Sequence, residues 1–590
     1  MKKIFLYGLA AAFALTSCED FLDSENYTGK DSDNFPKTEN DVNQMIASVY
    51  EASFYQPFAN NDVGQYLTWA NLASDDMYGG GGSDDKATQA LDHFLYNNNS
   101  QMESLWKAAY AAIARANSAL AAVDNVADEE LRNQAKGELL FMRAFNYFDL
   151  VKCFGYVPMV EKAPENVAEA QVSPEQVQPE VIYAKIGSDL KEAWEIMPAY
   201  PYDGWAKLAY GKVSKWAAGA LLARAYLFYT GFFNQSTLPT EDGTGITADY
   251  VKKVLDDIVD KSGHGLLDDY RSLWPYANEK TKADYDFVSD LGETWKEGNK
   301  EVLLAINYLY LSDWSGTQLH QSNQYALFFG IRNGGWGDGD CFLLTKTNED
   351  GTTEPMPGSV YPFGTGWGCG PVTPNFYDDW VKAEPNDKRR DASVLVFPDD
   401  WDWSNTSNWM EATGLHQKKM CAVRSSGGTK KSFCAELFAS EGDGHFQASH
   451  CQSLPLIRYA DVLLMRSELY QDASKGMNEV RARAGLGEVA YSLQALQNER
   501  RWELAFEGYR WDDMRRWGIA EEALAKQIGG AIHNDGSATQ MKDQGDGYVS
   551  RYKATKGYYR IPQAQVDLAN GAIKQNAGWD GTTGYYSQWQ

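Results

Sequence analysis

The most constraining feature of this sequence is an apolar segment that we predict to be a helix from about Glu130 to Phe154. Large apolar side chains fall on nearly every face of that helix: Leu139, Leu140, Phe141, Met142, Phe145, Phe148, Leu150 and Val151. A helix that is apolar all round must be covered by other elements. Gly155 and Pro158 end the segment. The pattern therefore predicts a buried helix inside a larger helical assembly.

Three more helices are predicted around this segment, over residues 102–123, 179–197 and 212–229. In the first, apolar residues form one stripe at helical spacing. The last is rich in Ala, from Ala217 to Ala225, and small side chains let helices approach closely. Successive helix pairs of this kind resemble tetratricopeptide-type units, although no regular period of about 34 residues is visible.

The character of the chain changes between about Gly263 and Cys451, where helical periodicity fades. Loops rich in Gly, Asp, Asn and Trp dominate there, and long loops inside a compact protein are usually functional. Helices are predicted again at about 458–470, 477–484 and 495–517, before a polar, aromatic tail. In the last of them, Asp512 and Arg516 have the spacing of an ion pair that contributes a few tenths of a kcal/mol when exposed.

The N-terminus has the pattern of a lipoprotein leader. Lys2 and Lys3 precede an apolar stretch from Ile4 to Leu15, which is too short to span a membrane, and Leu15-Thr16-Ser17-Cys18 resembles a lipobox. Cleavage before Cys18 and lipidation of its thiol would tie the protein to a membrane. The acidic stretch after Cys18 indicates a flexible tether and resembles a surface-export signal. The alternative is an ordinary signal peptide with a chance Cys.

Charge excludes one class of partner. Removal of residues 1–17, which contain two Lys and no acidic residue, changes the formal net charge from -27 to -29. Such a chain is a poor partner for nucleic acid or for an anionic membrane surface. Aromatic residues make up 13% of the sequence, including 19 Trp and 35 Tyr, so the chain is globular rather than disordered. No later apolar run is long enough to span a membrane.

The sequence contains no motif that demands catalysis, a metal or a cofactor. Nucleophile elbows, P-loops and zinc-protease motifs are missing, and paired acidic residues arise by chance in a chain with 81 of them. A metal site of Cys434, His445, His450 and Cys451 can be drawn, but its spacing matches no standard zinc module. The six Cys besides Cys18 could pair, although no spacing requires it. We therefore predict no catalytic residue, no metal and no cofactor.

Several ordered segments resemble the SusD/RagB family of surface glycan-binding lipoproteins. The matching segments are residues 106–117, 137–158, 223–227, 458–468, 478–485, 499–518, 561–562 and 575–579, and the strongest is Glu499-Arg500-Arg501-Trp502-Glu503-Leu504-Ala505-Phe506-Glu507-Gly508, continuing to Asp513-Met514-Arg515-Arg516-Trp517-Gly518. The resemblance implies an all-α, tetratricopeptide-containing fold with an irregular ligand-binding half. It also implies a partner, a SusC-like TonB-dependent transporter of the outer membrane.

With this resemblance, five parts of the chain are predicted. They are a signal peptide (1–17), a tether (18–35), an N-terminal helical part (36–262), a loop-rich ligand-binding part (263–450), and a C-terminal helical part with its tail (451–590), which packs with the N-terminal helices as one unit. A catalytic Glu could lie among Glu499, Glu503 and Glu507, but an ion network that braces the core is the favoured interpretation.

Candidate ligand contacts follow from sugar chemistry. Trp and Tyr rings stack on the apolar face of a pyranose, while Asp, Asn, Gln and Arg bond its hydroxyl rim. Trp in Gly-, Asp- and Asn-rich loops fit this role, namely Trp314, Trp336, Trp401 and Trp403, with Trp367 less favoured because its neighbours resemble a structural family segment. Trp69, Asp75, Asp76 and Tyr78 are further candidates, at a helix end in a region that often borders the family's binding surface. The competing interpretation of any single Trp is core packing.

We therefore predict a cell-surface lipoprotein that captures an oligosaccharide or polysaccharide and delivers it, without catalysis, to a partner transporter. A peptide-binding version of the same fold and a surface glycosidase are the alternatives. The sequence does not identify the glycan.

Overall fold

The structure is a computed structural model of residues 1–590. It describes residues 35–54, 65–162, 174–311, 321–332, 345–348, 350–355, 363–364, 366–397, 399, 401, 403, 408–423 and 450–589. No helix among these residues is both long enough and apolar enough to cross a membrane.

Helices dominate the described chain, and this confirms the predicted all-α class. The N-terminal helices are α2 (Glu39–Phe54), α3 (Tyr66–Leu72), α4 (Lys86–Asp92), α5 (Glu103–Ala122), α6 (Glu129–Phe154), α8 (Pro179–Ile196), α9 (Lys215–Phe232) and α10 (Ala248–Lys261). The middle of the chain holds α11 (Glu279–Asp284), α12 (Asp286–Ser289), α13 (Gln324–Phe328), α14 (Pro374–Ala383) and α15 (Lys388–Ser393). The C-terminal helices are α17 (Tyr459–Tyr470), α18 (Met477–Arg483), α19 (Leu493–Glu503), α20 (Arg510–Arg516), α21 (Ala520–Ala525), α22 (Tyr548–Thr555) and α23 (Gln563–Leu568).

Strands in the described chain occur as short antiparallel pairs. The pairs are β1 (Thr237–Leu238) with β2 (Ile246–Thr247), β3 (Val302–Ile306) with β10 (Leu454–Arg458), β4 (Thr345–Thr347) with β5 (Thr353–Pro355), β6 (Phe363–Gly364) with β9 (Ala422–Val423), β7 (Val394–Val396) with β8 (Leu415–Gln417), and β11 (Ala531–Asn534) with β12 (Ser537–Gln540). Three of these pairs, β3 with β10, β6 with β9 and β7 with β8, join segments far apart in the sequence, and β4 with β5 forms a hairpin within the loop-rich part. Each sheet has only two strands, so the strands position loops and do not form a core sheet.

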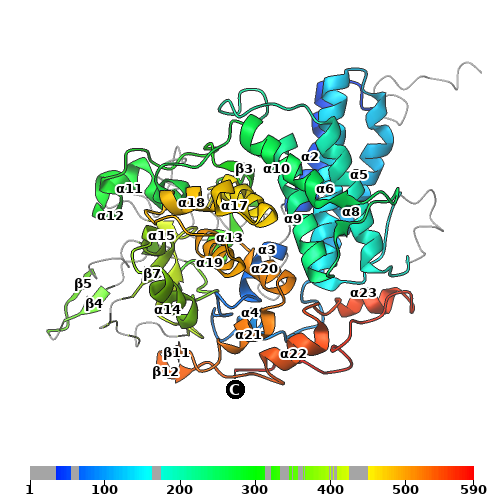
Figure 1. The fold of residues 1–590 in the computed structure, drawn as a ribbon. Coiled ribbons are helices and arrows are strands. Elements are labelled where there is room, and N and C mark those ends of the chain that lie inside the picture. The colour runs from blue at the N-terminus through cyan, green and yellow to red at the C-terminus, as the bar shows by residue number, and fades with distance from the viewer. Residues whose placement is uncertain are drawn as a thin grey trace, which may run out of the picture.

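The predicted N-terminal helices form as expected, and α6 is the buried one. It packs between α5 and α8. Helix α8 packs in turn on α9, and α9 packs on α10. Figure 1 shows these helices side by side on one side of the molecule, with the loop-rich part on the other and α19 and α20 between them. The Ala-rich α9 is buried along most of its length and also contacts α20, so the C-terminal helices pack directly against the N-terminal ones. The five predicted boundaries stay a prediction.

The predicted helix over 495–517 is wrong in one respect, because it is broken into α19 and α20. Phe506 and Gly508 between them have positive φ values of 64° and 79°. The positive φ of Gly508 favours Gly in this turn, and a Cβ there would lie 2.4 Å from Leu67 Cδ1 and displace that side chain. Glu507 lies in this break, and its carboxylate accepts hydrogen bonds from Arg458 and Lys419.

Candidate functional site

The sequence-predicted ligand contacts have different positions in the structure. Cys18, Trp314 and Trp336 lie outside the described residues. Trp69 and Tyr78 are fully buried; the indole of Trp69 packs edge-to-face against Trp511, and the hydroxyl of Tyr78 donates to the backbone oxygen of Gln527. Neither side chain offers exposed surface to a ligand.

Asp75 and Asp76 are also buried, in ion pairs with α19 and α20. Arg501 donates to Asp75 Oδ2 at 2.9 Å and to Asp76 Oδ1 at 2.8 Å, and Arg510 donates to Asp75 Oδ1 at 2.6 Å. Burial raises carboxyl pKa values, but the guanidinium groups of Arg501 and Arg510 outweigh it and hold the pKa of Asp75 below its usual range. These carboxylates anchor the segment after α3 to the C-terminal helices, which explains their position without a ligand.

The expectation of exposed Trp in the loop-rich part is wrong for two of the described residues. Trp401 is 7% exposed and packs edge-to-face on Phe397, and Trp367 is buried as well. Trp403 is only partly buried. Its ring is stacked on that of His533 from β11, with centroids 3.7 Å apart and planes 10° apart. Two of these three indoles are therefore core residues of the loop-rich part, and Trp403 is the one with surface left for a ligand.

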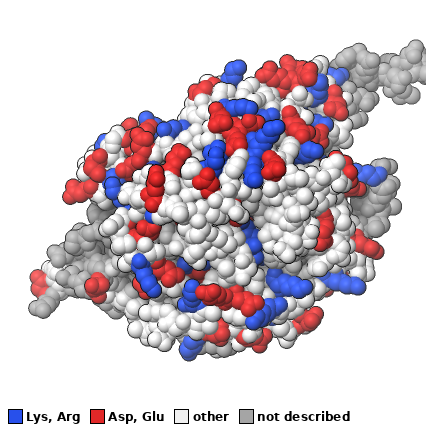
Figure 2. Space-filling model, in the orientation of Figure 1, with Lys and Arg blue, Asp and Glu red and all other residues white. Residues whose placement is uncertain are grey.

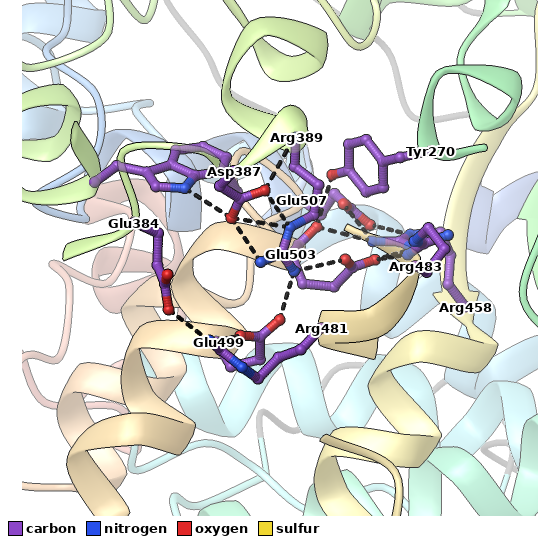
Figure 3. A network of polar contacts seen from close by, with 12 residues as sticks. Tyr270, Glu384, Asp387, Arg389, Arg458, Arg481, Arg483, Glu499, Glu503 and Glu507 are labelled. Atoms are coloured by element: carbon purple, nitrogen blue, oxygen red, sulfur yellow. Dashed lines mark hydrogen bonds and ion pairs between the residues drawn. The ribbon is translucent and has the colours of Figure 1, made fainter. Parts of the chain in front are cut away.

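The suspected catalytic glutamates belong to a buried ion network (Figure 3). Arg389, at the centre, donates to Glu499 Oε1 at 2.6 Å, to Glu503 Oε2 at 3.0 Å and to both carboxylate oxygens of Asp387. Arg481 bonds the other oxygen of Glu499 at 3.1 Å. All of these side chains are buried, so the favoured interpretation of a network that braces the core fits the structure.

The other end of the network surrounds Glu503. Arg458 donates to Glu503 Oε1 at 3.0 Å, and Arg483 donates to the same oxygen at 2.5 Å. Arg458 also bonds both oxygens of Glu507. Burial alone would raise the pKa of Glu503, but the charges of Arg483, Arg458 and Arg389 outweigh it and hold this pKa below its usual range. A permanently ionised, fully paired carboxylate away from solvent has no free proton to give to a leaving group.

The exposed ion pair predicted between Asp512 and Arg516 does not form. Asp512 instead accepts a hydrogen bond from Lys152 of α6 at 2.9 Å, and Arg516 bonds Asp513 and Glu468. Asp513 is on α20 itself, three residues before Arg516, whereas Lys152 belongs to α6 and Glu468 to α17. Spacing along one helix could not show the partners that come from these other helices. Acidic and basic side chains are likewise interleaved on the surface in Figure 2, so the net negative charge forms no single acidic patch on this face.

An aromatic surface that the sequence interpretation missed is built mainly from the loop that connects α8 to α9. We call Tyr202, Trp205, Tyr210, His264 and Asn307 the Trp205 surface. Trp205 is partly exposed, and its ring centroid lies 5.8 Å from Tyr202, 5.3 Å from Tyr210 and 5.8 Å from His264. Its indole N–H donates to the backbone oxygen of Gly298 at 2.7 Å, which fixes the ring.

The backbone of Trp205 is strained, with φ of 65°. A bulky residue seldom adopts the left-handed region, and strain of this kind gathers at functional sites. Asn307 Nδ2 donates to the backbone oxygen of Tyr210 at 2.8 Å. Leu309, two residues after Asn307, donates its backbone N–H to the backbone oxygen of Gln321 at 2.7 Å. The described residues that flank positions 312–320 therefore meet near the Trp205 surface. Trp314 belongs to that segment.

One signal in the sequence could have revealed the Trp205 surface. Tyr202-Asp203-Gly204-Trp205 has the same Trp, Gly and Asp composition as the loops that we singled out in the middle of the chain. It lies within the N-terminal helical part, where our candidate contacts were Trp69, Asp75, Asp76 and Tyr78. The approach of Asn307, about 100 residues later, is a tertiary feature.

A polar groove of about 390 Å³ lies elsewhere, between α14, α19 and α21. Its lining is mainly charged and amide side chains: Asp379, Lys382, Gln494, Gln497, Asn498, Arg501, Arg510, Glu522 and Lys526. The Trp502 ring that borders it is 2% exposed. The groove thus offers hydrogen bonds but almost no aromatic face, and it fits a sugar less well than the Trp205 surface.

Comparison with known proteins identifies the family. The profile of the SusD family matches residues 343–579, and a SusD-like profile described as "Starch-binding associating with outer membrane" matches residues 20–227. The chain belongs to the SusD family.

Relatives of this SusD-family chain align over nearly its whole length. SusD-like protein P2 of Formosa agariphila is 25% identical over 548 residues, which cover 89% of this chain and 92% of the relative. A solved structure named "Laminarin binding SusD-like protein" is 24% identical, with a TM-score of 0.65, and covers 92% of this chain and 100% of its own. Surface glycan-binding protein A from Bacteroides thetaiotaomicron, in complex with laminarihexaose, is 20% identical, with the same TM-score and coverage. The likeness to these structures shows a shared fold.

Proposed function

We propose that this SusD-family protein binds an oligosaccharide or polysaccharide at the cell surface without cleaving it. The observation that carries the proposal is the match of residues 20–227 to the profile described as "Starch-binding associating with outer membrane". The names of the similar structures, which mention laminarin and laminarihexaose, support a glycan as the ligand. Glu499 and Glu503 are buried and paired, and the partly buried Glu507 is paired as well, which supports binding over hydrolysis.

The Trp205 surface is our proposed contact for the glycan. Its partly exposed rings provide an apolar face for stacking on C–H groups, and Asp203 and Asn307 lie beside them as partners for hydroxyl groups. The rings are held by hydrogen bonds and by each other, so little side-chain entropy is lost on binding. Trp314, which lies outside the described residues, stays a proposed contact.

Trp403 is the second proposed contact, on a separate surface with His533. Trp205 packs on His264, just after α10, whereas His533 belongs to β11; α10 and the β11–β12 hairpin lie at opposite ends of the view in Figure 1. Asn408 and the exposed Asp535, which bond each other, provide polar groups near the ring pair. Trp336, outside the described residues, stays a proposed contact.

Alanine substitution tests both surfaces separately. We expect Trp205→Ala to weaken binding of laminarin about fivefold or more, since an aromatic contact contributes on the order of 1 kcal/mol. Trp403→Ala tests the second surface, and Tyr585→Ala, which removes an exposed aromatic ring elsewhere, is the matched control. Isothermal titration calorimetry with laminarin and a panel of other glycans gives the affinities. Unchanged affinity in the Trp205→Ala/Trp403→Ala double variant, for a glycan that the wild type binds, would place the site elsewhere.

The same calorimetry and a reducing-end assay separate the alternatives. New reducing ends after incubation with a bound glycan would mean a glycosidase. A protein that binds no glycan of the panel but binds peptides would instead be a peptide-capturing relative. Neither alternative is favoured by a specific contact in the structure.

We also propose that the protein is anchored in the outer membrane through Cys18 and delivers its glycan to a SusC-like TonB-dependent transporter. The profile description, which names the outer membrane, supports the location. A protein held at the surface by a lipid anchor needs such a partner to move a ligand across the membrane. Purification in mild detergent should recover a large transporter with this chain, and repeated recovery of the chain alone would contradict the partnership.

A further inference from the structure

Three buried side chains outside the proposed glycan surfaces form a compact cluster of metal-ligating groups. Asp92 ends α4, His93 follows it directly, and Glu411 comes from the loop before β8. One donor atom of each lies within 4.8 Å of the others. His93 Nε2 is 3.8 Å from Asp92 Oδ2 and 3.6 Å from Glu411 Oε1, and all three side chains are fully buried.

These distances are too long for hydrogen bonds, and the cluster leaves polar atoms without partners. Both ring nitrogens of His93, Asp92 Oδ1 and Glu411 Oε1 are buried and make no hydrogen bond. Within the described chain, no Lys or Arg forms an ion pair with Asp92 or Glu411. Unpaired buried charge is expensive, so two carboxylates in this position require a compensating positive charge.

The surroundings hold the donor atoms in place. Tyr548 donates its hydroxyl to Asp92 Oδ2 at 3.0 Å, and the backbone N–H of Gly80 donates to Glu411 Oε2 at 2.9 Å. The ring of Tyr548 also packs on His93, with centroids 4.7 Å apart. The backbone of Glu411 is left-handed, with φ of 54°, a conformation that non-Gly residues seldom adopt. The surrounding structure therefore holds this residue in place at some cost in strain. Such outer contacts are typical of metal ligands.

The negative charge of Asp92 and Glu411 could be compensated by a proton or by a metal ion. The two cases predict different distances between the donor atoms. A proton on one carboxyl group would close one hydrogen bond and draw two atoms below about 3 Å. A divalent ion at about 2.1 Å from each ligand would keep tetrahedral donor atoms about 3.4 Å apart. The separations of 3.6 and 3.8 Å between His93 Nε2 and the two carboxylates are closer to the spacing around an ion, and all three donor atoms lie within 4.8 Å of one another. Two carboxylates and one neutral imidazole would also balance its charge.

We propose that Asp92, His93 and Glu411 bind one divalent transition-metal ion of the Zn²⁺ class. Imidazole nitrogen with two carboxylate oxygens suits Zn²⁺ better than Ca²⁺ or Mg²⁺, which take six or more oxygen ligands. The ion has a structural role, since the site is closed to solvent. It ties the end of α4 to the loop of Glu411, which follows Trp403 in the chain and contacts β11 through Ala412 and His533.

Metal analysis of the full-length mature protein, purified in detergent from cells grown with Zn²⁺, tests the proposal. We expect about one equivalent of metal by inductively coupled plasma mass spectrometry. The variants His93→Gln and Glu411→Gln should each contain at least about tenfold less bound metal than the wild type. His264→Gln, which changes another buried His outside the cluster, is the matched control and should keep the metal.

The wild-type measurement decides the proposal even if a variant folds poorly. Less than about one-tenth of an equivalent of any transition metal, together with no rise in melting temperature on addition of Zn²⁺, would overturn it. The shared-proton alternative makes the opposite stability prediction: Glu411→Gln would then be as stable as the wild type or more stable, because it removes a buried charge. A metal site predicts that Glu411→Gln melts at a lower temperature and does not respond to Zn²⁺.

Discussion

Substitution of Arg389 by Met provides a direct test of the buried ion network. Arg389 is fully buried and is the only described residue that forms an ion pair with Asp387, and it also bonds Glu499 and Glu503. Its removal leaves carboxylates in the interior with less compensation, which typically costs about 3–5 kcal/mol. Met fills part of the volume, so lost packing adds little to this change. We therefore expect Arg389→Met to lower the free energy of unfolding by about 3–5 kcal/mol.

Arg115 provides the matched control, because its ion pair has the same length. Arg115 Nη1 lies 2.6 Å from Glu51 Oε2, as Arg389 Nη1 lies 2.6 Å from Glu499 Oε1, but the side chains of Arg115 and Glu51 are 43% and 49% exposed. An exposed pair contributes about 1 kcal/mol or less. Guanidinium unfolding followed by Trp fluorescence should therefore show a much smaller effect for Arg115→Met. Equal effects of the two substitutions would refute the argument from burial.

The pH dependence adds a second signature. Burial raises the pKa of Glu499, and Arg389 opposes that rise. Without Arg389 the pKa rises further above its unfolded value, so the folded state binds the proton more tightly than the unfolded state and gains stability as pH falls. The difference in the free energy of unfolding between Arg389→Met and the wild type should therefore become smaller as the pH falls from 8 to 5. A deficit that is constant or grows over this range would show that lost packing, and not uncompensated charge, causes the effect.

Two further predictions concern the anchor and the helix packing. Cys18→Ala should move the protein from the membrane fraction to the soluble fraction, because lipidation needs the thiol; sedimentation with outer membranes that lack the transporter would contradict the lipobox interpretation. Gly187→Ala in α8 should destabilise the protein by about 1–3 kcal/mol, since the new Cβ would lie 2.3 Å from the backbone oxygen of Pro239, whereas Gly292→Ala meets nothing within 4 Å and should be neutral in the same thermal melt. Equal melting temperatures of these two variants would count against the close packing of α8.

The helices of the N-terminal half could be predicted from the sequence because helical periodicity is local. The stripe of apolar residues in α5, the all-round apolar surface of α6 and the Gly and Pro that follow it are written in consecutive residues. The same local pattern misled us at α19 and α20, where two residues with positive φ interrupt a continuous helical pattern. That interruption serves contacts with Leu67 and Arg458, which no local pattern contains.

The exposure of single side chains was decided only by the tertiary structure. Trp401 and Trp403 stand two residues apart in one loop, yet the first packs on Phe397 and is buried, while the second stays partly exposed against His533, 130 residues later. Asp75 likewise ceases to be a surface candidate because Arg501 and Arg510 reach it from the C-terminal helices. Composition reveals which side chains could meet a sugar or a metal ion. Which of them do face one depends on distant segments that cover a ring or neutralise a charge, and that information exists only in the packed chain.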